Sequence, residues 1–97
     1  MTDPELGDMV ARLWERMRPV VAERLHVMGR AAEPGADADV RAAAAEAAHK
    51  LAGSLGSYGY PGGSRLAARI EEALRADVPG QSVAGLVDAL RREVGLG

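Results

Sequence analysis

The sequence predicts an all-α protein, built as an up-and-down bundle of four antiparallel helices. Apolar residues recur at spacings of three and four along most of the chain, which is the pattern of one face of a helix. The composition agrees, because strong helix formers such as Ala, Leu, Arg and Glu are abundant while aromatic residues make up only 3%. Short segments containing Pro or Gly separate the helical stretches, and short connections place successive helices antiparallel in a bundle.

The first helix contains a proline near its middle. Apolar residues follow helical spacing over residues 6–17 and again over residues 20–28, with Pro19 between them. A proline is tolerated in the first turn of a helix or at a kink, because it lacks the backbone N–H that an interior turn requires. We therefore expect one long helix that is kinked or split near Pro19. Met9 is expected in the core, and Trp14 either there or across the end of the bundle.

The second helix is predicted from about residue 40 to residue 58, after a loop at residues 33–37. Either Asp37 or Asp39 can cap it, since a short acidic side chain accepts a hydrogen bond from the free N–H groups of a first turn. At about 100° per residue, a set of apolar residues on this helix points within about 40° of one direction. This core stripe consists of Val40, Ala44, Ala47, Leu51, Leu55 and Tyr58.

Two further helices complete the predicted bundle. Residues 59–64 are rich in glycine and are predicted as a loop, with Ser64 as the cap of the third helix. Residues 77–80 form the next turn, and the last helix carries apolar residues from Val83 to Val94. We expect residues 1–97 to form a single domain, since a chain of 97 residues is short even for one.

The charge and the composition argue against several classes of protein. With 12 basic and 14 acidic residues the net charge is −2, whereas nucleic-acid-binding proteins normally carry a basic excess. Cysteine is absent, which excludes disulfides, thiolate metal sites and a cysteine nucleophile. No stretch approaches the ~18–20 apolar residues of a membrane span, and the acidic start of the chain is unlike a signal peptide. We expect a cytoplasmic protein without nucleic-acid or membrane partners.

One histidine lies on an unusual helix face. On the predicted second helix, His49 points about 160° away from the core stripe, near the middle of the solvent side. A glycine inside a helix costs about 0.8–1.0 kcal/mol relative to alanine, yet two occur on this face. Gly53 removes the side chain that would otherwise cover the imidazole, so a flat partner surface can approach it. The neighbours of His49 on this face are Ala42, Ala45, Glu46, Gly53 and Gly56.

Three kinds of chemistry are open to this histidine. A general base needs an orienting carboxylate and a pocket; Glu46 can orient the ring, but a convex helix face is no cleft. A metal ligand needs partners, and His26, the only other histidine, belongs to a different helix. A nucleophile toward phosphorus needs little beyond exposure and steric room. The bare face favours the nucleophile, and we predict no metal site.

The residues around His49 resemble the core motif of histidine-containing phosphotransfer (HPt) domains. Trp14 and Pro19 resemble the bulky residue and the proline of that family's first helix, and residues 63–71 resemble its next helix. The motif consists of His, Leu at +2, Gly at +4, a small residue at +5 and Gly at +10. These positions are occupied by His49, Leu51, Gly53, Ser54 and Gly59, in a Leu-Ala-Gly variant of the motif.

The resemblance implies a four-helix phosphocarrier that is not itself an enzyme. In a bacterial two-component phosphorelay, His49 would accept a phosphoryl group from the aspartyl phosphate of a receiver domain and pass it to another receiver. The chain would need no cofactor of its own, because magnesium and the catalytic groups would belong to the receiver, and we expect a monomer. Lys50, Gly53 and Glu46 would surround the phosphoryl group. The receiver would dock on Ala42, Ala45, Ala52, Gly56 and Ser57.

The chain also departs from the family's usual pattern. Many members have lysine three residues after the histidine, where this chain has Ala52. Lys50 is the only lysine, and it lies about 100° around the helix from His49, where its long side chain can still reach a phosphoryl group. The loop predicted at residues 59–63 is longer than the commonest form.

Other function classes remain open from sequence alone. The dimerisation helix of a histidine kinase also exposes a phosphoacceptor histidine, but it has an acidic residue directly after that histidine, where this chain has Lys50. A module that docks receivers without transferring phosphate would use the same face, and a helical adaptor would use the Ala and Gly residues as a packing seam.

Overall fold

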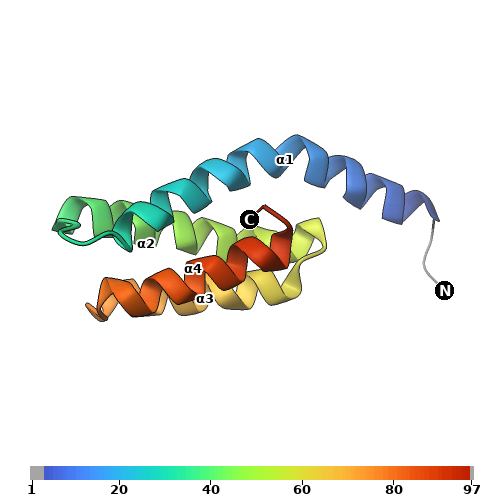
Figure 1. The fold of residues 1–97 in the computed structure, drawn as a ribbon. Helices are drawn as coiled ribbons and strands as arrows, with labels where there is room; N and C mark the ends of the chain where they lie inside the picture. Colours follow the sequence, from blue (N-terminus) through green and yellow to red (C-terminus); the bar gives the residue numbers. More distant parts are fainter. Residues whose placement is uncertain (1–3, 97) are drawn as a thin grey trace.

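The computed structural model describes residues 4–96, which form the predicted all-α, up-and-down four-helix bundle. The helices are α1 (Pro4–Ala31), α2 (Ala38–Ser54), α3 (Pro61–Arg75) and α4 (Gly80–Val94). A short 3₁₀ helix, η1 (Leu55–Tyr58), follows α2 directly. Successive helices run antiparallel, each packs on the next, and α1 closes the bundle against α4 (Figure 1).

Helix α1 is continuous through Pro19 and bends near its middle (Figure 1). The helix is therefore kinked and not split, as expected where a proline removes one backbone hydrogen bond. Its N-terminal turns project past the other helices (Figure 1). Met9 is 64% exposed on this projecting part, so the prediction that it lies in the core is wrong. The apolar spacing there is helical, but no neighbouring helix reaches far enough to cover it.

Aromatic side chains close the end of the bundle from which α1 projects. The Trp14 ring lies edge-on to Tyr60, with ring centroids 4.8 Å apart, and it also contacts Tyr58 at 6.4 Å. Of the two positions predicted for Trp14, the structure shows the one across the bundle end, where it is half-buried. The aromatic contacts hold α1 against the segment that connects α2 to α3.

The predicted cap of the second helix is confirmed at its N-terminus. The carboxylate of Asp37 accepts a hydrogen bond from the Val40 N–H at 2.9 Å, which satisfies one free donor of the first turn. At the other end, the regular α helix stops at Ser54, four residues before the predicted end. The last residues tighten into η1, so that Leu55 remains fully buried.

The connection from η1 to α3 is shorter than predicted. Only Gly59 and Tyr60 lie outside helices, because Pro61 occupies the first turn of α3, where its fixed φ suits a helix start. Gly59 has φ 94°, a left-handed conformation that favours glycine. The predicted role of Ser64 as a helix cap is also wrong. Its hydroxyl lies one turn inside α3 and accepts a hydrogen bond from the Gly56 N–H at 2.8 Å.

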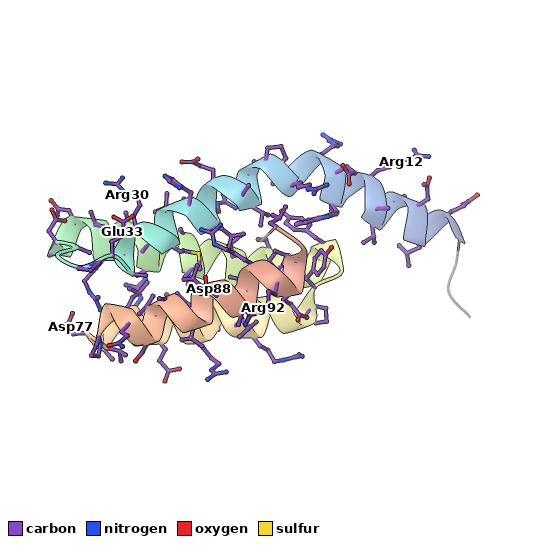
Figure 2. All side chains as sticks on the ribbon, viewed as in Figure 1. Arg12, Arg30, Glu33, Asp77, Asp88 and Arg92 are labelled. Carbon is purple, nitrogen blue, oxygen red and sulfur yellow. The ribbon has the colours of Figure 1, made fainter. Side chains whose placement is uncertain are left out.

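The core runs through all four helices and contains only apolar residues in the part that the structure describes. Charged side chains such as Arg12, Arg30 and Asp88 lie on the surface (Figure 2). Across residues 4–96, no helix combines the length and the apolar character that crossing a membrane requires. The largest fully buried side chains are Val21, Leu25, Met28, Leu51, Leu55, Ile70, Val83 and Leu90.

Two glycines give a matched test of this packing. A Cβ atom added at Gly63 would lie 3.1 Å from Leu55 Cδ1, 3.3 Å from Tyr60 Cβ and 3.4 Å from Val94 Cγ1, whereas one at Gly85 would meet nothing within 4 Å. We expect Gly63→Ala to lower the free energy of unfolding by about 1–3 kcal/mol. Gly85→Ala should raise it by up to about 1 kcal/mol. Urea denaturation followed by far-UV circular dichroism measures both, and a neutral Gly63→Ala would contradict the close packing.

Candidate functional site

His49 lies on α2 with its side chain 65% exposed, at the edge that faces α3. Its exposure agrees with the sequence, but its position on the helix differs. Because α2 packs against both α1 and α3, its buried arc is wider than the predicted stripe. Ala45 and Ala48 are buried on the α3 side, which moves the centre of that arc to about 130° from His49. The histidine therefore lies beside the α2–α3 seam and not in the middle of the solvent side.

The five residues predicted for a docking face divide into two groups. Ala42, Gly56 and Ser57 are exposed, as a docking role requires. Ala45 is only 3% exposed, so its predicted place on the open face is wrong, and Ala52 is half-buried against the core. Both residues point toward α3. A helical projection of α2 alone does not include its packing against α3, so it cannot predict that these residues are covered. The small-residue surface beside His49 is narrower than predicted.

The fold itself does not require glycine at positions 53 and 56. A Cβ atom at Gly53 would meet nothing within 4 Å, and one at Gly56 would make an ordinary contact with the Ser64 hydroxyl at 3.5 Å. Neither residue has positive φ. Gly53, which lies in α2, still costs about 0.8–1.0 kcal/mol of helix propensity relative to alanine, whereas Gly56 lies in η1, where this α-helix cost does not apply. The structure gives no internal packing reason for these glycines, and they leave open surface next to the imidazole.

A carboxylate from the neighbouring helix contacts the imidazole. Glu71 Oε1, on α3, lies 3.1 Å from His49 Nδ1. Its other oxygen, Oε2, accepts a hydrogen bond from Arg75 Nε at 2.9 Å. From the sequence, the orienting role is assigned to Glu46 and no role to Glu71. Among the described residues, however, Glu71 is the carboxylate that reaches the ring, and its side chain is only 20% exposed.

A signal for Glu71 does exist in the sequence. Glu71 directly follows Ile70, which belongs to the buried stripe of α3, so it stands at the border of that stripe. A charged residue at such a border can reach across to the next helix. Which residue of α2 it meets depends on how the two helices pack, and this does not follow from either helix alone.

The contacts of Glu71 with Arg75 and His49 favour the ionised form of its carboxyl group. The hydrogen bond from Arg75 lowers the pKa of the Glu71 carboxyl below its ordinary value of 4.5, partial loss of hydration opposes this, and the contact with His49 lowers it further. Glu71 is therefore ionised at neutral pH and can only accept hydrogen bonds. In the neutral imidazole, the Nδ1 atom of His49 must then carry the proton, which leaves the lone pair on Nε2. The arrangement prepares Nε2 as a nucleophile.

The other predicted surroundings of His49 are solvent-exposed. Lys50, Gly53 and Glu46 all lie on the surface of α2. Within residues 4–96, no group of three or more His, Asp or Glu side chains is placed to hold a metal ion. A shallow hollow of about 360 Å³ lies at the α2–α3 seam, on the N-terminal side of His49 along α2, with Ala42, Ala45 and Arg75 among its lining residues.

Comparison with known proteins gives one match. A family model described as the Hpt domain matches residues 12–95, which takes in most of α1 and all of α2, α3 and α4. Searches among curated proteins and among solved structures found no match.

The contact with Glu71 predicts the tautomer of His49. We expect ¹⁵N chemical shifts of the ring in the wild type, at a pH where the imidazole is neutral, to report a proton mainly on Nδ1. In Glu71→Gln the preference should relax, because a side-chain amide can donate as well as accept. Glu46→Gln is the matched control and should leave the shifts unchanged. An equal response to both substitutions would mean that Glu71 does not set the tautomer.

Proposed function

Because the chain belongs to the Hpt domain family, we propose that it is a phosphorelay intermediary that takes a phosphoryl group onto His49 from one receiver domain and passes it to another. The observation that carries this proposal is the environment of His49. The imidazole is exposed, its Nδ1 is held by an ionised carboxylate, and the position one turn further along α2 is an open glycine.

The transfer step uses the lone pair on Nε2. This nitrogen attacks the phosphorus of the receiver's aspartyl phosphate in line with the leaving oxygen. The P–O bond breaks, the aspartate leaves as a carboxylate, and a P–N bond forms. Nδ1 keeps its proton, so the phosphorylated ring carries a positive charge that faces the Glu71 carboxylate. Return of the phosphoryl group to a second receiver reverses these steps and releases the neutral ring.

The surroundings of His49 indicate which catalytic groups this chain supplies and which the receiver must supply. The chain supplies a phosphoacceptor and the carboxylate that positions it, both at the exposed α2–α3 seam, where the neighbouring hollow is shallow. In this proposal, the magnesium ion and the remaining catalytic groups belong to the receiver, so the chain is a carrier and not an enzyme. The role also places the protein in the cytoplasm.

The docking surface in this proposal is the exposed part of the predicted face. Ala42, Gly56 and Ser57 present little beyond a methyl group, a hydroxyl and backbone, and Gly53 presents backbone alone. A flat receiver surface can therefore approach close enough for its aspartyl phosphate to reach Nε2. Ala45 and Ala52 contribute to packing against α3 and the core instead of to direct contact.

Phosphotransfer profiling tests the proposed function directly. Purified protein would be mixed with radiolabelled phospho-receivers from the same genome. We expect label to move to the wild type and to His26→Gln, the control for the other histidine, but not to His49→Gln. The label on the protein should be stable in alkali and labile in acid. Receivers that bind but transfer no label would indicate a docking module, and receivers that neither bind nor transfer would refute the phosphorelay role.

A bulkier side chain at Gly53 should separate docking from folding. Gln is a better helix former than Gly, so we expect Gly53→Gln to be at least as stable as the wild type. Its side chain would cover the imidazole and hold a receiver away, and the binding affinity should fall about tenfold or more. Gly85→Gln, at an equally open position on α4, should bind like the wild type. Calorimetric titration measures both; unchanged binding by Gly53→Gln would remove Gly53 from the docking surface.

A further inference from the structure

We propose that Arg75 is the cation that binds the phosphoryl group on His49, and that it leaves Glu71 to do so. The inference rests on the proposed function, since it concerns the phosphorylated form of the same histidine. In this inference, the positive guanidinium of Arg75 pairs with the negative charge that a phosphoryl group would bring to the α2–α3 seam.

Arg75 lies next to the imidazole across a single carboxylate. The two oxygens of Glu71 are shared between His49 Nδ1, at 3.1 Å, and Arg75 Nε, at 2.9 Å. A guanidinium has five N–H donors in a rigid plane, and Nε provides only one of them. The Arg75 side chain is 55% exposed and lines the hollow beside Ala42 and Ala45, so its remaining donors border open space.

Phosphorylation changes the charges around this pair. A phosphoryl group on Nε2 brings two negative charges close to the Glu71 carboxylate, which is already negative, and the ring gains only one positive charge. The electrostatic repulsion between the phosphoryl group and Glu71 is reduced most if a second cation moves to the phosphoryl oxygens. Guanidinium groups bind phosphate oxygens through two parallel hydrogen bonds, a geometry that the ammonium group of lysine does not offer.

The other cations near the seam are less well placed. Lys50 lies about 100° around α2 from His49, on the side away from α3. Arg41 donates to the Val78 carbonyl at 3.0 Å and lies 3.8 Å from Asp77, and its side chain is only 18% exposed. Arg75 can exchange partners, because its pairing with Glu71 joins residues four apart on one helix surface, a type of ion pair that is individually weak.

We therefore expect Arg75 to exchange one hydrogen-bond partner for another when His49 is phosphorylated. In the unphosphorylated protein, Arg75 donates a hydrogen bond to Glu71, and the ionised Glu71 keeps the proton on Nδ1. Once the P–N bond has formed, Arg75 turns to the phosphoryl oxygens, and Glu71 remains as the partner of the positively charged ring. Arg75 thus changes partner in the reaction, from the Glu71 carboxylate before transfer to the phosphoryl oxygens after it.

The test uses phosphoramidate, a small phosphodonor that requires no receiver, in a His26→Gln background so that only His49 reacts. We expect Arg75→Ala to slow phosphorylation of His49 about tenfold, the size of a lost charge-assisted hydrogen bond. Arg75→Lys should recover part of the rate. Arg69→Ala, which removes an exposed arginine elsewhere on α3, should stay within about twofold of the parent protein.

A second readout separates phosphoryl binding from positioning. In ¹H–¹⁵N spectra, the Arg75 Nε–H resonance should move when His49 is phosphorylated, while the Arg69 resonance should not. The His49 tautomer in unphosphorylated Arg75→Ala should stay as in the parent, because Glu71 remains ionised at neutral pH. Equal rates for Arg75→Ala and Arg69→Ala, or an unmoved Arg75 resonance, would overturn the inference even if receivers phosphorylate His49. Conversely, failure of every receiver to transfer would refute the proposed function and leave this result standing.

Discussion

The alanine-rich face of α2 lets two helices pack against it at the same time, and the arrangement of the site depends on this packing. Ala44, Ala45, Ala47 and Ala48 are all buried, and their small side chains allow α1 and α3 to lie close on either side. A helix with larger residues at these positions would hold α3 further away. Glu71 would then fall short of the imidazole, and His49 would be an exposed histidine with no partner to fix its proton.

Periodicity within one helix predicted those features that depend on one helix alone. The bend at Pro19, the cap at Asp37 and the exposure of His49 each follow from local spacing and local hydrogen bonding. The same reasoning was wrong for Ala45 and Met9, because burial there depends on where a neighbouring helix lies or ends. An apolar residue on a projecting turn looks the same in sequence as one under a neighbour.

In the functional site too, some features follow from one helix alone and others depend on how the helices pack. The resemblance to HPt domains and the helical projection both pointed to His49, but the carboxylate that orients the ring comes from α3, 22 residues along the chain. Its place at the border of the buried stripe of α3 distinguishes Glu71 from Glu72, but the residue of α2 that Glu71 meets depends on how the two helices pack. The glycines were equally ambiguous, since Gly53 and Gly63 both lie within helices. Only the packing distinguishes the open position of Gly53 from the close contacts of Gly63 with η1 and α4.

The aromatic contacts at one end of the bundle have a consequence for optical measurements on the protein. The chain contains one Trp, two Tyr and no Phe, and Trp14 packs against both tyrosines. Near-ultraviolet absorbance, fluorescence and near-ultraviolet dichroism therefore all originate in a single patch between α1 and the η1–α3 connection. The opposite end, where Asp77 marks the α3–α4 turn (Figure 2), contributes no chromophore of its own. These three signals would not detect fraying that begins at that end. A melting curve recorded with any of them therefore reports the unfolding of the aromatic end, which can come after the first opening of the bundle.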